Sequence, residues 1–273
     1  MNRIEQIYQM PDKVACLTLD FERDYGDRIG EFNLLHDTEG LSRLGQLFRE
    51  LSLPVSAFIC TDLLVEYPSS LAVVEDLAVD YHCHSHTHDT DDFDSARELR
   101  KTAATFTDQF GYAPLGYRAP MGVLYPDDIM LLKEHGFKFS ASVFPTWRPG
   151  RFNNRSLPLL PFRYGNGIIE LPFAAIPGIR SVVSLSYLKM LGWWLNRLGF
   201  GLCGLPDVLV IDSHLHDFLV DEKSFRQLPW KLQLAWSRNK YAGCEYLARL
   251  VQHLRQRGYR FITMTRLYEL LVE

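Results

Sequence analysis

The sequence contains neither a long apolar run nor a paired set of cysteines. Its five cysteines are odd in number and scattered along 273 residues, which fits reduced thiols better than a disulfide framework. No stretch of about 18 uninterrupted apolar residues is present, so we expect no transmembrane helix. The first twenty residues have no basic segment followed by an apolar run and a cleavage site, so we expect a cytoplasmic protein.

The sequence also lacks an excess of positive charge. Lys and Arg number 29 against 33 Asp and Glu, and the net charge of −4 offers no general attraction to phosphate backbones, so we expect no nucleic-acid partner. The segment 182–203 is apolar but interrupted by charged and amide side chains, which predicts an amphipathic helix. This helix could pack on the core or make a peripheral membrane contact. No feature indicates an obligatory protein partner.

Short apolar runs alternate with helical patterns along most of the chain. The expected strands are 14–21, 55–61, 138–144, 167–173, 206–216 and 259–264. The expected helices are 41–51, 70–78, 95–111, 126–136 and 246–258. This alternation is typical of a parallel sheet, and at this length an α/β barrel is plausible. The 47% hydrophobic content suits one large core, so we expect a single domain over residues 1–273.

Two acidic residues stand at the end of the first predicted strand. Side chains alternate along an extended backbone, so Asp20 and Glu22 should lie on the same side. Two carboxylates at that distance repel each other unless a cation or a proton lies between them. Solvated acids at the end of a strand are the alternative interpretation.

Four of the nine histidines fall within seven residues, at 82, 84, 86 and 88. If this segment is a strand, all four rings share one side. If it is helical, His84 and His88 face one ion together at a spacing of four residues. Neutral imidazole is a good ligand for zinc-like ions, so the cluster indicates a metal site.

Two further polar clusters follow predicted extended segments. Arg118 precedes Ala-Pro in a rigid stretch, where its planar fork could orient a carboxylate or form an ordinary surface salt bridge. His214 and His216 share one face at the end of a strand, with Asp217 next to them, and a histidine there could protonate a leaving amine. The sequence has no serine nucleophile elbow and no glycine-rich phosphate loop.

Taken in order, these clusters resemble the motifs of the polysaccharide deacetylase family, also called carbohydrate esterase family four or the nodulation-protein-B homology domain. The resemblance runs from about Val14 to Leu271 and rests on residues 84–88 (His-Ser-His-Thr-His), 118–120 (Arg-Ala-Pro) and 215–217 (Leu-His-Asp). It implies a distorted (β/α) barrel and removal of acyl groups from amino sugars with a divalent metal ion.

The resemblance also implies a role for each matched position. Asp20 is similar to the general base, Arg118 to the residue that orients it, and His216 to the general acid. The implied metal ligands are Glu22, His84 and His88, holding one divalent ion that we expect to be zinc, with cobalt, nickel or manganese as alternatives. We expect substrate contacts from Pro120, Met121 and Trp147.

Two departures from the family pattern bear on the substrate and on the acid. The usual first motif of the family has two adjacent aspartates, whereas here the acids are Asp20 and Glu22. This spacing resembles that of the family branch that acts on lipid-linked sugars. The fourth motif, at 139–145, lacks the aspartate and tryptophan that tune the catalytic histidine. We therefore expect a deacetylase of an amino sugar in a polysaccharide or a cell-envelope glycolipid precursor. The alternatives are a deformylase or amidase on a lipid-linked or small amide, and a catalytically silent barrel that acts as a binding module.

Overall fold

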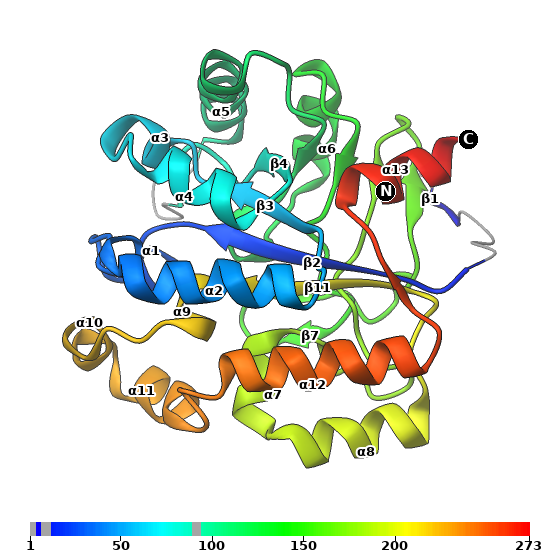
Figure 1. The fold of residues 1–273 in the computed structure, drawn as a ribbon. Helices are drawn as coiled ribbons and strands as arrows, with labels where there is room; N and C mark the ends of the chain where they lie inside the picture. The colour runs from blue at the N-terminus through cyan, green and yellow to red at the C-terminus, as the bar shows by residue number, and fades with distance from the viewer. Residues whose placement is uncertain (1–3, 7–11, 89–93) are drawn as a thin grey trace.

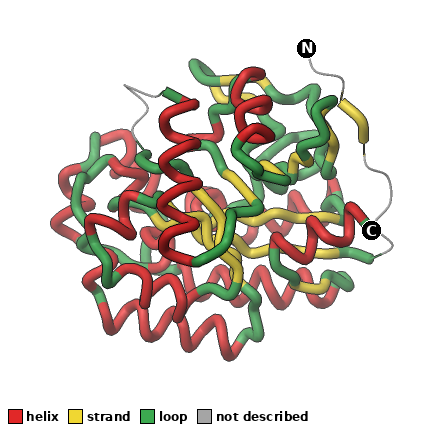
Figure 2. The backbone as a smooth tube through the Cα atoms, turned by 90° about the horizontal axis from the view of Figure 1, so that it is seen from above, coloured by secondary structure: helices red, strands yellow, loops and turns green. Residues whose placement is uncertain are grey.

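The computed structural model describes residues 4–6, 12–88 and 94–273, and its centre is a strongly curved sheet covered by helices (Figures 1 and 2). All eight residues of β2 (Val14–Phe21) are buried, which explains why this strand is apolar rather than alternating. The remaining parallel strands run outward on both sides of β2. They are β3 (Val55–Ile59), β4 (Asp80–Cys83), β5 (Gly116–Tyr117), β6 (Phe139–Ser140), β10 (Ile169–Glu170), β11 (Val208–His214) and β12 (Arg260–Phe261).

The chain that follows β10 closes the sheet on itself. Leu171 donates its backbone N–H to the carbonyl of Ser140 in β6, and three residues later Ala174 donates to Val210 in β11, both at 2.8 Å. The segment after β10 therefore joins the β6 side of the sheet to β11, which lies next to β2. The sheet closes in this way, and the predicted distorted barrel is confirmed. Three antiparallel pairings lie outside this arrangement, involving β1 (Ile4–Gln6) with β9 (Phe162–Tyr164), β9 with β10, and β7 (Trp147–Arg148) with β8 (Phe152–Asn153).

Three predicted strands are much shorter than expected, among them the run 259–264, which forms only the two residues of β12. The run 138–144 forms only the two residues of β6, because the buried carboxylate of Glu170 accepts the backbone N–H groups of Ser142 and Val143 at 2.9 and 2.7 Å. A side chain thus takes the place of the sheet ladder there. The run 167–173 forms the two residues of β10 and then crosses to β11.

The predicted helices are present, with ends shifted by up to three residues. The helix expected at 41–51 begins at Thr38, because the Asp37 side chain accepts the N–H of Gly40 at 2.9 Å and caps it. The long helices are α2 (Thr38–Glu50), α4 (Ser70–Leu77), α5 (Ser95–Phe110), α6 (Pro126–Glu134), α12 (Gly243–Gln256) and α13 (Met264–Val272). The shorter ones near the site are α1 (Asp24–Asp27), α3 (Asp62–Glu66), α9 (Leu215–Phe218), α10 (Glu222–Gln227) and α11 (Trp230–Ser237).

The amphipathic helix predicted within 182–203 is two helices, α7 (Leu185–Leu191) and α8 (Trp193–Cys203). Gly192 separates them with φ of +86°, a conformation that other residues rarely adopt. In the described part of the chain no helix has the length and apolar character needed to cross a membrane, as expected.

Candidate active site

The predicted catalytic and metal-binding residues lie around a cleft of about 290 Å³ at the carboxyl ends of the parallel strands, where barrel enzymes place their chemistry. Asp20 is near the end of β2, and its register partner in β11 is His214. Glu22 follows β2, and the histidine segment follows β4. The charged residues and histidines that line the cleft are Asp20, Glu22, Arg28, His84, His88, Arg118, Arg148, Asp212, His214 and His216.

Glu22, His84 and His88 converge on one point. The Oε2 atom of Glu22 lies 3.1 Å from Nε2 of His88 and 3.6 Å from Nε2 of His84, and all three side chains are buried. The segment 84–88 is neither strand nor helix, so both predicted backbone conformations are wrong, although His84 and His88 face one point together as the helical alternative expected. Ser85, at φ of +67°, turns the chain, and an irregular loop brings the two rings together.

The residues around these three side chains fit a divalent ion. Nδ1 of His84 lies 3.0 Å from the carbonyl oxygen of Arg118, which leaves Nε2 as the nitrogen facing Glu22. Oε1 of Glu22 is buried and has no hydrogen-bond partner among the described residues. Two imidazoles and a carboxylate form a typical ligand set for a catalytic zinc ion. The ligand atoms of this group lie within 4.8 Å of one another.

The protonation of Glu22 and His88 also suits metal binding. Burial alone would raise the pKa of Glu22, but His88 and His84 hold it well below its usual range. Burial lowers the pKa of His88 to about 4, so its ring is neutral near pH 7. An ionised carboxylate and a neutral imidazole are the forms that ligate a metal.

Arg118 pairs with the predicted base. Its Nη1 donates to Oδ1 of Asp20 and, at 3.2 Å, to Oδ1 of Asp212, while Nε donates to the carbonyl of Ala141 at 3.1 Å. The side chain is 1% exposed and lies over the ring of Phe58 at 3.9 Å from its centroid. A surface salt bridge is therefore excluded, and the guanidinium is a buried cation between two carboxylates.

His214 projects into the cleft beside these carboxylates. Its Nε2 lies 3.9 Å from both Asp20 and Glu22 and 3.8 Å from Asp212, and its Nδ1 lies 3.5 Å from Asp217. Burial lowers the pKa of His214, but Asp212 and the other carboxylates outweigh it and hold the pKa well above the usual value. Among the described residues, two other groups of side chains could ligate a metal ion, and both contain His214. One adds His216 and Asp217, and the other adds Asp20 and Asp212.

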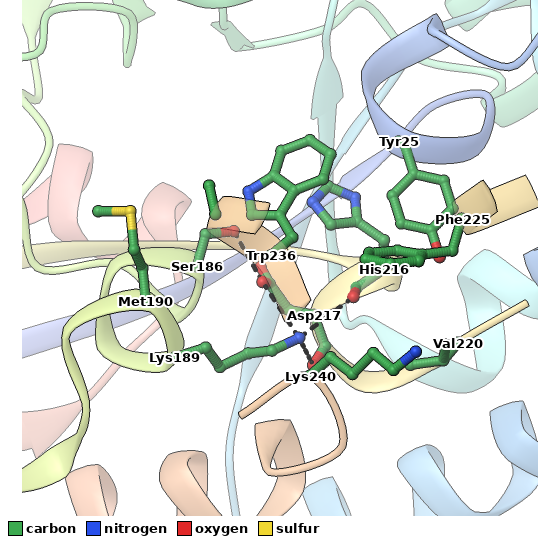
Figure 3. Close-up of a pocket in the computed structure, with 11 residues that line it drawn as sticks. Tyr25, Ser186, Lys189, Met190, His216, Asp217, Val220, Phe225, Trp236 and Lys240 are labelled. Carbon is green, nitrogen blue, oxygen red and sulfur yellow. Dashed lines mark hydrogen bonds and ion pairs between the residues drawn. The ribbon is translucent and has the colours of Figure 1, made fainter. Parts of the chain in front are cut away.

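His216 occupies a different environment. Figure 3 shows its ring in a small pocket with Tyr25 and Trp236, whose centroids lie 5.2 and 4.9 Å from it. The ring also stacks on His214 at 4.8 Å, and its Nε2 has no hydrogen-bond partner among the described residues. Burial, together with the charge of His214, lowers the pKa of His216 to about 3. Lys189 holds the backbone here by donating to the carbonyl of Asp217 at 2.7 Å.

Of the three residues predicted to contact the substrate, only Met121 lines the cleft, and its φ is +57°. Pro120 is buried and does not line the cleft, and Trp147 stands on β7 with 56% of its surface exposed and Arg155 over its ring. The alternation of side chains in the run 206–216 could have identified Asp212 as a partner of His214, because residues two apart on a strand share a face. No pattern in the sequence indicated that Tyr25 or Trp236 would lie at the site.

Searches against protein-family models and curated proteins found no match. Among solved structures, a protein from Mycobacterium smegmatis assigned as a polysaccharide deacetylase superposes with a TM-score of 0.60 at 17% identity, over 98% of this chain and 94% of that one. One from Pseudomonas aeruginosa with the same assignment gives 0.56 at 16% identity, over 95% and 91%. A CE4 family pseudoenzyme from Bacillus anthracis gives 0.55 at 12% identity, over 94% and 66%. The chain thus has the fold of the polysaccharide deacetylases, as its sequence motifs predict.

Proposed function

We propose that this protein is a metal-dependent hydrolase that removes an acyl group from the nitrogen of an amino sugar. The observation that carries the proposal is the convergence of Glu22, His84 and His88 beside Asp20, whose carboxylate is held by Arg118. A buried group of this composition has no evident structural use, because each member costs desolvation energy unless an ion or a reaction partner compensates for it.

The side chains divide the work of amide hydrolysis. A divalent ion bound by Glu22, His84 and His88 would supply a Lewis acid that polarises the acyl carbonyl and acidifies water. Asp20, fixed by its hydrogen bond from Arg118, would accept the proton of the attacking water. A protonated histidine would then give its proton to the departing nitrogen, leaving a free amine and a carboxylate product.

We assign the proton donor to His214 rather than to His216. Nε2 of His214 faces the cleft within 4 Å of both Asp20 and Glu22, whereas the ring of His216 is packed between aromatic rings. Asp217 approaches Nδ1 of His214 and accepts its backbone N–H at 3.1 Å, so the ring is fixed with Nε2 toward the substrate. His216 would serve as packing behind it.

Asp212 fills the place of the acid that the fourth motif lacks. It is two residues before His214 on β11 and faces the same side, with its Oδ2 3.8 Å from Nε2 of His214 and its Oδ1 bonded to Arg118. One buried aspartate thus connects the arginine that orients the base with the histidine that supplies the proton. This arrangement argues against a silent barrel, since the missing acid is replaced from a neighbouring position.

The cleft favours a substrate that bears both apolar and anionic groups. Arg28 and Arg148 line it together with aromatic and aliphatic side chains, and an arginine fork suits a phosphate. We therefore favour a cytoplasmic enzyme acting on the amino sugar of a lipid-linked or nucleotide-linked precursor. The acyl group could be acetyl or formyl. Acetate and formate release from N-acetyl and N-formyl amino sugars, free and attached to a lipid diphosphate, would separate these substrates.

The first test is metal content and turnover of the full chain and its His84→Ala variant. The wild-type protein should retain about one equivalent of zinc after dialysis and should release acylate, and the variant should lose both. Turnover that persists in the metal-free protein would contradict the scheme, as would zinc retention without any hydrolysis.

The second test compares His214→Asn with His216→Asn. Loss of a general acid typically costs 10²–10⁴ in rate, so His214→Asn should lower kcat by roughly a thousandfold, while His216→Asn should change it by less than about tenfold. Melting temperature and zinc content serve as controls for folding. The opposite ranking would return the role to His216 and leave the rest of the proposal unchanged.

A further inference from the structure

Helix α8 exposes an apolar face to the outside of the molecule. Trp194 and Leu202 are 73% and 76% exposed, and Leu195 and Leu198 are exposed on the same side. The opposite side of α8 is also apolar and is buried in the core, where Trp193 packs edge-on against a ring of α12. Asn196 and Arg197 are the only polar side chains of α8, so its outer face carries much more apolar surface than a solvated helix needs and has the composition of an interaction surface.

Helix α11 extends this surface to the cleft. Trp230 and Leu234 are exposed on its outer side, while Leu232 and Trp236 on the other side line the cleft. Both α8 and α11 pack against α7, and Figure 1 shows the three helices along the lower edge of the molecule, away from α5 and α6. We call the exposed residues 194, 195, 198, 202, 230 and 234 the α8–α11 surface.

Exposed cations border this surface, although the whole protein carries −4. Arg197 of α8 lies over the ring of Trp194, 5.6 Å from its centroid, and Lys231 of α11 lies over the ring of Trp230 at 5.8 Å. Arg226 and Arg238, on either side of α11 in the chain, are also exposed. Cationic and apolar side chains are therefore adjacent on the outer sides of both helices.

We propose that the α8–α11 surface binds a lipid bilayer that contains anionic lipids. Tryptophan and leucine flanked by lysine and arginine are the composition of helices that lie in a membrane interface, and the cations complement an anionic headgroup layer. A second copy of this chain fits less well, because a symmetric contact would bring the same cations together. Binding in this orientation would set the mouth of the cleft, through α11, close to the headgroups.

Vesicle sedimentation tests the proposal directly. The full chain should sediment with vesicles of phosphatidylcholine containing one quarter phosphatidylglycerol, and binding should fall at least tenfold with pure phosphatidylcholine. The double variant Trp194→Glu/Leu202→Glu should bind the anionic vesicles at least tenfold more weakly than wild type. The matched control, Val65→Glu/Val79→Glu, adds the same charges at exposed apolar residues outside the surface and should bind as wild type does.

Three results would overturn the proposal. These are wild-type protein that does not sediment with anionic vesicles, equal loss of binding in the two double variants, or a solution dimer that Trp194→Glu/Leu202→Glu dissociates. Circular dichroism should show that both variants keep the wild-type fold. Hydrolysis of a water-soluble N-acyl amino sugar should be the same in all three proteins, so a failure of membrane binding is distinguishable from a failure of the proposed reaction.

Discussion

At the scale of single residues, the site depends on one buried cation. Arg118 lies between Asp20 and Asp212 and over an aromatic ring, so its fork is fixed by hydrogen bonds and by packing. Burying a guanidinium costs several kcal/mol, which its two carboxylate partners must offset. Burial raises the pKa of Asp212 and the nearby Asp20 adds to that rise, whereas the charges of His214 and Arg118 oppose it.

The substitution Arg118→Lys tests this geometry while keeping the charge. Lysine is a single point donor and cannot bond Asp20, Asp212 and the carbonyl of Ala141 together. We expect kcat to fall by about a hundredfold from misplacement of Asp20, with zinc content unchanged. Arg155→Lys, at an exposed arginine outside the cleft, is the control and should leave kcat within twofold. Equal rates for the two variants would show that charge alone suffices.

The sequence predicted most of the residues at the site but not the full network. The acids Asp20 and Glu22, the histidines 84 and 88 and Arg118 are recognisable because each lies at or just after the end of a strand. Asp212 was not predicted as a site residue, and of the two histidines in this segment the resemblance of the Leu-His-Asp triplet to the family motif favoured His216 as the acid. Which of the two rings approaches Asp20 and Glu22 depends on the start of α9 after β11, where Asp217 caps the chain at His214. That is a tertiary detail with no signature in the spacing.

At the scale of elements, strands and helices with strong periodicity were predictable and short irregular segments were not. The strand at 14–21 was predicted to the residue, since a buried central strand is a continuous apolar run. The loop 84–88 and the break at Gly192 depend on positive φ angles at single residues, which periodicity does not reveal. Two-residue strands such as β5 are held by their neighbours rather than by their own sequence.

Asp80 joins three elements and provides a test at this scale. Its carboxylate accepts hydrogen bonds from Ser56 in β3 at 3.0 Å and from the backbone and hydroxyl of Thr265 in α13 at 2.9 and 2.7 Å. His82, 3.0 Å away, adds an ion pair when it is protonated. Burial alone would raise the pKa of Asp80, but His82 and these hydrogen bonds hold it well below its usual range.

A lowered pKa in the folded state stabilises the protein above the unfolded pKa of about 4, and this contribution is lost as the pH falls toward the folded value. We therefore expect Asp80→Asn to reduce the free energy of unfolding by about 2 kcal/mol at pH 7. At pH 3 the difference from wild type should be smaller by about 1 kcal/mol. Urea unfolding at both pH values measures this, with the exposed Asp108→Asn as control. A difference that does not change with pH would contradict the linkage.

At the scale of the whole molecule, closure of the barrel is what assembles the site. The segment 171–174 connects β6 and β10 to β11 and so closes the sheet. Strands from distant parts of the chain therefore end around one cleft. The sequence predicts each strand but not its order in the sheet, because pairing depends on contacts far apart in the chain. Glu22 and His84 are 62 positions apart and meet only in the closed barrel.

A ligand that bridges these distant segments should stabilise the entire fold. The unfolded chain separates Glu22 from His84 and His88, so zinc should bind the native state far better, and at a hundredfold excess over Kd the gain is about 2.7 kcal/mol. For a chain of this size we expect Tm to rise by roughly 5–10 °C when zinc is added to chelator-treated protein. Glu22→Gln should abolish most of that rise, and His36→Ala, at an exposed histidine outside the site, should keep it. If Glu22→Gln shows the full rise in Tm, the ion binds somewhere other than the point where these three side chains converge.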